Sequence, residues 1–239
     1  MTRRGIKVKL GSIRDRAVQW LERRLVNKLL PTGNIERLSV DSSGSADHQE
    51  YLQYQMEKSL SLSAYTNRLK WARSARKGLI DDLRNLCIER SIEPREIVAI
   101  GCRDEIEIRL LSGRFKLAKV TGLDLFSANK DIIIGDMHAL PFGSMSFDAV
   151  LMNHSLEHSN RVEQALSEAI RCLKKGGLLA IEVPIRYEIS KSDLVDFGSI
   201  AGLLETMKNF DEMRLLYGKD IYRGDDGSSA NMRAIFVKL

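Results

Sequence analysis

The sequence predicts a doubly wound α/β fold, in which a mostly parallel sheet of seven strands follows an N-terminal helical extension. Three observations predict it. Short apolar runs recur after Pro94, and most are separated by stretches with helical spacing. These runs are apolar throughout, which is typical of parallel strands that are buried on both faces of a sheet. Two more strand-like runs come last, and an antiparallel pair at one edge is a common finish for such a sheet.

The core elements are assigned in chain order. Helices are expected at 104–111 and 161–173, and the second is closed by the KKGG run at 174–177, because cations in the last turn and glycine beyond it are typical helix ends. A helix at 197–207 comes next, and 218–232 is interpreted as a hairpin-like excursion. The expected strands are 96–100 (EIVAI), 120–125 (VTGLDL), 132–135 (IIIG), 147–152 (FDAVLM), 178–183 (LLAIEV), 213–217 and 234–237.

The N-terminal part has a different character. Residues 13–30 have the spacing of a helix with one apolar side, which could lie on a membrane surface, dock on a partner or pack on its own domain. Residues 41–47 (DSSGSAD) indicate a flexible linker. Residues 51–92 are expected to be helical in one or two pieces, the second of which covers the edge of the sheet.

The predicted division of the chain follows from these patterns. Residues 1–48 form a basic N-terminal helix and linker, and residues 49–239 form the main domain. Within the main domain we expect lid helices at 49–94, a cofactor-binding core at 95–184, and further lid and final strands at 185–239.

The composition narrows the class of protein. Residues 1–95 carry 19 Lys and Arg against 11 Asp and Glu, a net charge of +8, whereas residues 96–239 have a net charge of −3. The basic part is either a solvated lead-in or a contact for an anionic surface. Three widely spaced cysteines argue against a disulfide framework, and no apolar run is long enough to span a bilayer. We therefore expect a cytoplasmic protein, with peripheral membrane contact through residues 13–30 as a further option.

The ligand site is expected beyond the carboxyl ends of the strands. Gly101 ends the first strand, where the missing side chain lets the backbone approach a ligand. Asp124 ends the second strand, near the offset at which an acidic side chain accepts hydrogen bonds from a ribose. A structural turn with a capping aspartate is the alternative, but the combination favours a nucleoside ligand.

The loop after the first strand discriminates between nucleoside cofactors. Its sequence, GCRDEIE, holds one glycine and three carboxylates, which would repel a pyrophosphate. S-adenosylmethionine has no phosphate and carries a sulfonium and an ammonium group, so acidic surroundings suit it better than they suit a nicotinamide dinucleotide.

Residues 97–183 resemble the class I S-adenosylmethionine-dependent methyltransferases, which have a Rossmann-like sheet, and in particular the methyltransferase type 11-like domain. The matching pieces are IVAIGCRDE, VTGLDLFS, GDMHALPFGSMSFDAVLMNHSLEHS and ALSEAIRCLKKGGLLAIEVP, in the order of the family. The resemblance implies that S-adenosylmethionine is bound by Gly101, Cys102 and Arg103 around its methionine part, Asp124 at the ribose, Leu125, Asp136 and Met137 at the adenine, and Asn153 and His154 near the reactive methyl.

One departure from the family pattern lies in the first loop. Ala99, Arg103 and Glu105 stand where the family has an acidic residue and further glycines. Either a variant loop still binds the cofactor, or the site is degenerate and the fold serves as a catalytically inactive scaffold. The retained ribose and adenine positions favour binding.

Two histidines follow the fourth strand. His154 and His158 are candidate bases by location, but local packing or hydrogen bonding is the favoured interpretation for both. The segment also spells H-x-x-E-H, a zinc-peptidase pattern that needs both histidines on one helical face. A strand directly before His154 argues against a helix that presents both histidines on one face, so no metal is expected.

The identity of the methyl acceptor is inferred from features that the sequence lacks. We expect a small-molecule or glycan and lipid-linked acceptor, because the core shows no aromatic and basic platform for reading bases. A nucleic-acid methyltransferase guided by the basic N-terminus is the alternative. The sequence predicts no particular oligomeric state.

Overall fold

The computed structural model describes residues 36–38, 46–66, 70–102, 105–127, 129, 131–223 and 229–239. The helix expected at 13–30, most of the linker and Arg103 lie outside the described residues. No described helix is both long enough and apolar enough to cross a bilayer.

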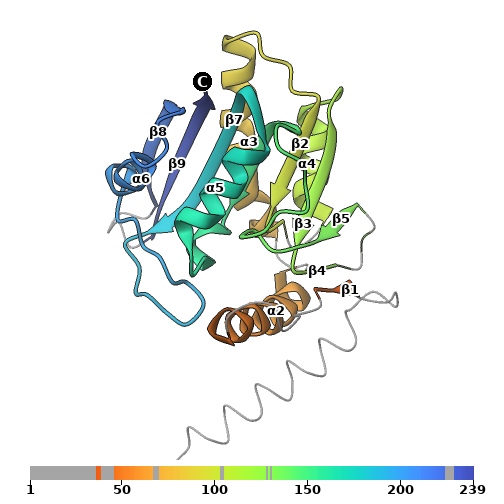
Figure 1. Cartoon of the computed structure of the whole chain (residues 1–239), viewed down its shortest axis with the longest axis vertical. Helices are drawn as coiled ribbons and strands as arrows, with labels where there is room; N and C mark the ends of the chain where they lie inside the picture. The colour runs from red at the N-terminus through yellow and green to blue at the C-terminus, as the bar shows by residue number, and fades with distance from the viewer. Residues whose placement is uncertain are drawn as a thin grey trace, which may run out of the picture.

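A seven-stranded sheet forms the centre of the molecule (Figure 1), which confirms the predicted fold class. The strand order is β5-β3-β2-β6-β7-β9-β8. The first five strands in this order are parallel, and β9 runs antiparallel to both β7 and β8. The strands are β2 (Glu96–Ile100), β3 (Lys119–Asp124), β5 (Ile132–Ile134), β6 (Phe147–Asn153), β7 (Leu173–Ile185), β8 (Met213–Arg223) and β9 (Ser229–Lys238).

Helices cover both faces of this sheet. The described helices are α2 (Ala46–Thr66), α3 (Lys70–Glu89), α4 (Glu105–Arg114), α5 (Val162–Cys172) and α6 (Ile200–Met207), with a short 3₁₀ turn, η1 (Leu156–His158). Side chains of successive strand residues point to opposite faces. On β2, Val98 and Ile100 therefore join the core with α5 and α6, whereas Ile97 and Ala99 join the core with α3 and α4.

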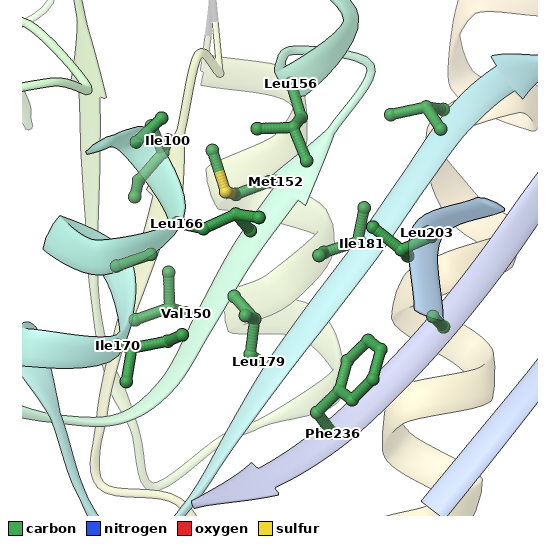
Figure 2. Close-up of a cluster of buried hydrophobic side chains, with 14 of the residues drawn as sticks. Ile100, Val150, Met152, Leu156, Leu166, Ile170, Leu179, Ile181, Leu203 and Phe236 are labelled. Carbon is green, nitrogen blue, oxygen red and sulfur yellow. The ribbon is translucent and has the colours of Figure 1, made fainter. Parts of the chain in front are cut away.

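The core under α5 and α6 is close-packed (Figure 2). Leu166 and Ile170 of α5 lie against Val150 of β6 and Leu179 of β7. The amphipathic spacing of α5 presents its apolar stripe to the sheet, and burial of this kind contributes roughly 25 cal/mol per Å² of apolar surface. This packing fixes the position of β6, and so of the residues that follow it.

Three sequence-based predictions need correction. Helix α3 covers a face of the sheet and not its edge, because Leu79 and Leu83 are fully buried against β2, β6 and β7. The KKGG run belongs to β7, and α5 already ends at Cys172. The strands expected at 213–217 and 234–237 are longer than predicted, because β8 and β9 extend through residues 223 and 229 as an antiparallel pair that includes most of the hairpin-like segment at 218–232.

A second, two-stranded sheet was not predicted. β1 (Glu36–Arg37) pairs antiparallel with β4 (Phe126–Ser127), and the Leu38 amide donates to the Leu125 carbonyl at 2.8 Å. Part of the segment assigned to the N-terminal extension is therefore hydrogen-bonded directly to the residues that follow β3.

Candidate active site

A pocket of about 480 Å³ lies at the point where the strand order reverses, between the carboxyl ends of the neighbouring strands β2 and β6. It opens to solvent. In Figure 1, α2 and the segment between β7 and α6 lie beyond this end of the sheet. The lining residues are Tyr51, Gln55, Ile100, Gly101, Leu123, Asp124, Leu125, Gly135, Met137, His154, Ser155 and His158.

Gly101 lies at the base of the pocket in a conformation that only glycine adopts easily. Its φ is 73°, and a Cβ added there would lie 2.4 Å from Cβ of Ser155. Ser155 was not singled out by the sequence. Its buried Oγ has no hydrogen-bond partner among the described residues and lines the pocket, so a bound ligand would satisfy it.

Asp124 and Leu125 form the neighbouring wall. Asp124 is the last residue of β3 and is only 8% exposed. Its Oδ1 accepts a hydrogen bond from the Leu125 amide at 2.7 Å, which fixes the orientation of the carboxylate. Both residues therefore lie where the sequence placed them, at the end of the second strand of the sheet.

Asp136 lies behind the pocket and not on its wall, in a cluster that ties α2 to the loop after β5. Its Oδ1 accepts hydrogen bonds from the amide and ring of His138, and its Oδ2 contacts His48 Nε2 at 2.9 Å. Burial opposes ionisation, but the bonds to His138 and His48 outweigh it and lower the pKa of Asp136 to about 2. Met137, the next residue, does line the pocket.

This cluster also contains the one group of His and carboxylate ligand atoms among the described residues that could converge on a metal ion. Its ligand atoms lie within 4.8 Å of one another. In the structure they bond to each other, and His138 Nε2 contacts Ser159 Oγ at 2.8 Å. The arrangement acts as a hydrogen-bonded clasp between His48 on α2 and the loop that carries Met137.

His154 is held between two carboxylates. It follows β6 with a φ of 55°, and its Nδ1 and Nε2 each lie 3.6 Å from a carboxylate oxygen, of Glu157 and Glu182 respectively. Burial disfavours the charged ring, but the two carboxylates outweigh burial and raise the pKa of His154 to about 9. The two carboxylates thus favour the protonated ring, which has no lone pair with which to accept a proton. The H-x-x-E-H segment crosses a 3₁₀ turn, so its histidines do not share a helical face.

A buried ion network lies behind His154. Glu182 on β7 is fully buried and accepts hydrogen bonds from Arg233 Nε at 2.6 Å and Asn231 Nδ2 at 2.9 Å, both on β9. Arg233 Nη1 in turn donates to Asp82 on α3 at 2.9 Å. Buried charges require such partners, and the network ties β7, β9 and α3 together.

His158 differs from His154 in its hydrogen bonds. Its Nδ1 donates to the Ser192 carbonyl at 2.7 Å and lies 3.1 Å from Oδ1 of Asp193. The same carbonyl accepts a bond from Gln55 Nε2 at 3.1 Å. Burial disfavours protonation, but Asp193 and Glu157 raise the pKa of His158.

The remaining predicted residues lie beside the pocket. Cys102 is 1% exposed and directs its Sγ to the Leu123 carbonyl at 3.8 Å, and Asn153 is 4% exposed at the end of β6. Neither lines the pocket. The sequence predicted that the helices at 49–94 and residues 185–208 would form a lid. Among the described residues of these helices, only α2 contributes side chains to the pocket, because α3 packs on a face of the sheet. The sequence did not predict which side chains of α2 reach the site.

Comparison with known proteins identifies related sequences and folds. Residues 98–181 match the family model described as "Methyltransferase domain". The chain is 34% identical over 93 residues to malonyl-[acyl-carrier protein] O-methyltransferase 1 of Coxiella burnetii, covering 37% of this chain and 33% of that protein. It is 36% identical over 78 residues to demethylmenaquinone methyltransferase of Renibacterium salmoninarum, covering 33% of this chain and 31% of that protein. The matched segment thus spans about a third of the length of these relatives.

Solved structures share the fold over longer stretches. The 1,6-didemethyltoxoflavin-N1-methyltransferase of Burkholderia thailandensis, solved with S-adenosylhomocysteine, aligns over 87% of this chain and 96% of that one, with a TM-score of 0.59 and 13% identity. The [4+2]-cyclase SpnF aligns over 99% of both chains, with a TM-score of 0.51 and 15% identity. At these identities the likeness concerns the fold alone.

Proposed function

We propose, from the class I methyltransferase domain that the chain contains, that it is an S-adenosylmethionine-dependent methyltransferase acting on a small molecule. One observation carries this proposal. The pocket at the strand-order reversal is lined by Gly101, Asp124, Leu125 and Met137, which are four of the positions that the family resemblance assigns to the cofactor.

The chemistry of these residues fits the cofactor. The Asp124 carboxylate, at the end of β3, is of the type that accepts hydrogen bonds from ribose hydroxyls. Leu125 and Met137 offer apolar surface to an adenine, and the missing side chain of Gly101 lets a ligand approach the backbone. The Ser155 hydroxyl has no hydrogen-bond partner among the described residues. When bound, S-adenosylmethionine supplies a methyl group already activated by a sulfonium.

The pocket also favours a small acceptor. Tyr51 and Gln55 of α2 close one side of it, and the Gln55 amide is hydrogen-bonded to the segment after β7. This arrangement restricts the acceptor to what fits beside α2. The names of two relatives include a small reacting group, the malonyl group of malonyl-[acyl-carrier protein], and a small molecule, demethylmenaquinone.

Two experiments test the proposal. Calorimetric titration with S-adenosylhomocysteine should give binding that Asp124→Asn weakens at least tenfold, because the variant loses a charged acceptor worth about 1.5–3 kcal/mol per hydrogen bond. Asp131→Asn is the matched control, since Asp131 is an exposed aspartate that does not line the pocket. Unchanged binding in Asp124→Asn would refute the role of Asp124 at the ribose, and no binding to the folded wild-type chain would favour the inactive scaffold.

Binding alone does not establish methyl transfer, because the fold is shared with a protein named as a cyclase. The second experiment therefore follows transfer of a labelled methyl group from S-adenosylmethionine to small-molecule acceptors. Transfer to RNA or DNA that disappears on removal of residues 1–48 would instead support the nucleic-acid alternative.

A further inference from the structure

The four histidines of the chain differ in whether a ring nitrogen is available in the pocket. His48 and His138 are engaged in the clasp around Asp136 and do not line the pocket. His154 lines it, but both of its nitrogens face carboxylates. His158 lines it with only Nδ1 engaged, and no hydrogen bond joins its Nε2 to any of the described residues.

The partners of Nδ1 determine the tautomer of His158. A backbone carbonyl only accepts hydrogen bonds, so the Ser192 carbonyl at 2.7 Å requires a proton on Nδ1. Asp193 Oδ1, at 3.1 Å, is a second acceptor on the same side. In the neutral ring the lone pair must therefore be on Nε2, the nitrogen on the opposite edge.

Asp193 is itself held in place. Its Oδ2 accepts hydrogen bonds from the hydroxyls of Ser190 at 3.0 Å and Ser192 at 2.8 Å, and it lies 3.4 Å from Lys58 Nζ on α2. The backbone of the same segment is fixed to η1, because the amides of residues 194 and 195 both donate to the Glu157 carbonyl. The segment after β7 and the helix α2 thus jointly present a carboxylate to the histidine.

We propose that His158 Nε2 is the general base of the reaction and that Asp193 is its positioning residue, so the acceptor carries a dissociable proton on the atom that is methylated. This inference rests on the proposed function. The acceptor group is then a hydroxyl, such as that of a phenol or hydroquinone, an amine or an acidic carbon. It is not a carboxylate, because a carboxylate is already ionised at neutral pH.

The proposed step couples proton transfer to methyl transfer. The acceptor proton passes to His158 Nε2, and the electron pair left on the acceptor forms the new bond to the methyl carbon. The bond from that carbon to the sulfonium breaks, and its electron pair remains on sulfur. Asp193 and the Ser192 carbonyl stabilise the imidazolium through Nδ1, and the ring afterwards releases the proton from Nε2 to solvent.

The charges around His158 support this role. Burial opposes the imidazolium, but Asp193 and Glu157 favour it and raise the pKa of His158. A cation, Lys58, also lies beside this pair, but it contacts Asp193 Oδ2, whereas His158 contacts Oδ1. The reaction rate should accordingly rise with pH as His158 loses its proton. Removal of the Asp193 charge should move this rise to lower pH.

Nitrogen-15 NMR of the full chain with labelled histidine tests the assignment without any acceptor. Spectra are recorded from pH 5 to 10 with S-adenosylhomocysteine, and His158→Gln identifies the signals. We expect the neutral ring to carry its proton on Nδ1, and Asp193→Asn to keep this tautomer but titrate at lower pH. Asp196→Asn is the matched control, because Asp196 lies in the same segment but accepts bonds from the amides of residues 186 and 198. A proton on Nε2 of the neutral ring, or the same titration in Asp193→Asn as in wild type, would overturn the proposal.

Methyl transfer from S-adenosylmethionine to a panel of hydroquinone, substituted phenols and malonate provides the second readout. We expect transfer to the phenolic compounds, reduced about 10²–10⁴-fold in His158→Gln, while calorimetry still detects binding of S-adenosylhomocysteine to this variant. Transfer to malonate alone, at an equal rate in His158→Gln, would overturn the proposal. Calorimetry on the same samples separates the two failures, because loss of binding refutes the proposed function whereas binding with the wrong tautomer refutes only the role of His158.

Discussion

Replacement of Gly78 by alanine should destabilise the protein, although the same change normally stabilises a helix. Gly78 lies in α3, and a Cβ added there would lie 1.8 Å from Nη2 of Arg233. Real Cβ contacts are essentially never shorter than 3.0 Å, so the guanidinium must move by more than 1 Å. It is not free to do so, because Glu182 and Asp82 hold it at 2.6 and 2.9 Å.

The magnitude follows from two opposing effects. Alanine in place of glycine within a helix contributes about 1 kcal/mol of stability. A displacement of more than 1 Å breaks at least one charge-assisted hydrogen bond, which costs about 1.5–3 kcal/mol, and up to about 5 kcal/mol if Glu182 is left unpaired. Gly78→Ala should therefore lower the free energy of unfolding by about 0.5–4 kcal/mol.

Urea unfolding measures this value, and two comparisons isolate its cause. Gly113→Ala in α4 meets no atom within 4 Å and should be stabilising by up to about 1 kcal/mol. In a background with Glu182→Gln and Arg233→Ala, the obstacle is absent and Gly78→Ala should also stabilise. Equal stabilisation by Gly78→Ala in the wild-type chain would refute the reasoning, because it would mean that the guanidinium is not fixed by its partners.

Two further predictions concern the pocket. Gly101→Ala should abolish calorimetric binding of S-adenosylhomocysteine, because its Cβ would occupy the space of the Ser155 side chain, whereas Gly176→Ala, with a nearly equal φ of 74° but open surroundings, should cost only about 1–2 kcal/mol of stability and keep binding. His154 should titrate by NMR near pH 9, and because its folded pKa is above the unfolded value near 6.5, the stability it contributes should be complete below pH 6.5 and lost as the pH rises through 9. A His154 midpoint below pH 7 would contradict the two-carboxylate environment.

The parallel strands were predictable because their signal is local. An apolar run such as EIVAI at 96–100 specifies a buried strand without reference to the rest of the chain, and its limits agree with β2. By contrast, β1 and β4 are two residues long each, which is too short for any periodicity. The length of β9 was underestimated because Asn231 and Arg233 are polar, and only their pairing with Glu182 allows them to be buried in a strand.

The residues of the site likewise fall into those that the sequence could predict and those that it could not. Gly101 and Asp124 could be predicted because their role depends on their position at a strand end. Gln55, Ser192 and Asp193 could not, because they reach His158 and the pocket from segments more than 130 residues apart in the chain. The sequence assigned both segments to a lid, but only the tertiary contacts show which side chains the lid contributes.

The place of β9 between β7 and β8 has a consequence for the order in which the protein can fold during synthesis. β8 pairs within the sheet only with β9, which leaves the ribosome after it. A nascent chain that ends before β9 can assemble the five parallel strands but has no position for β8, and the edge of β7 stays open to other strands. Such a chain also lacks Arg233, so Glu182 has yet to receive its main partner. The insertion of this one strand therefore completes the hydrogen bonding and the charge balance of the sheet in a single event, and chaperones that protect open strand edges should act on the chain until it occurs.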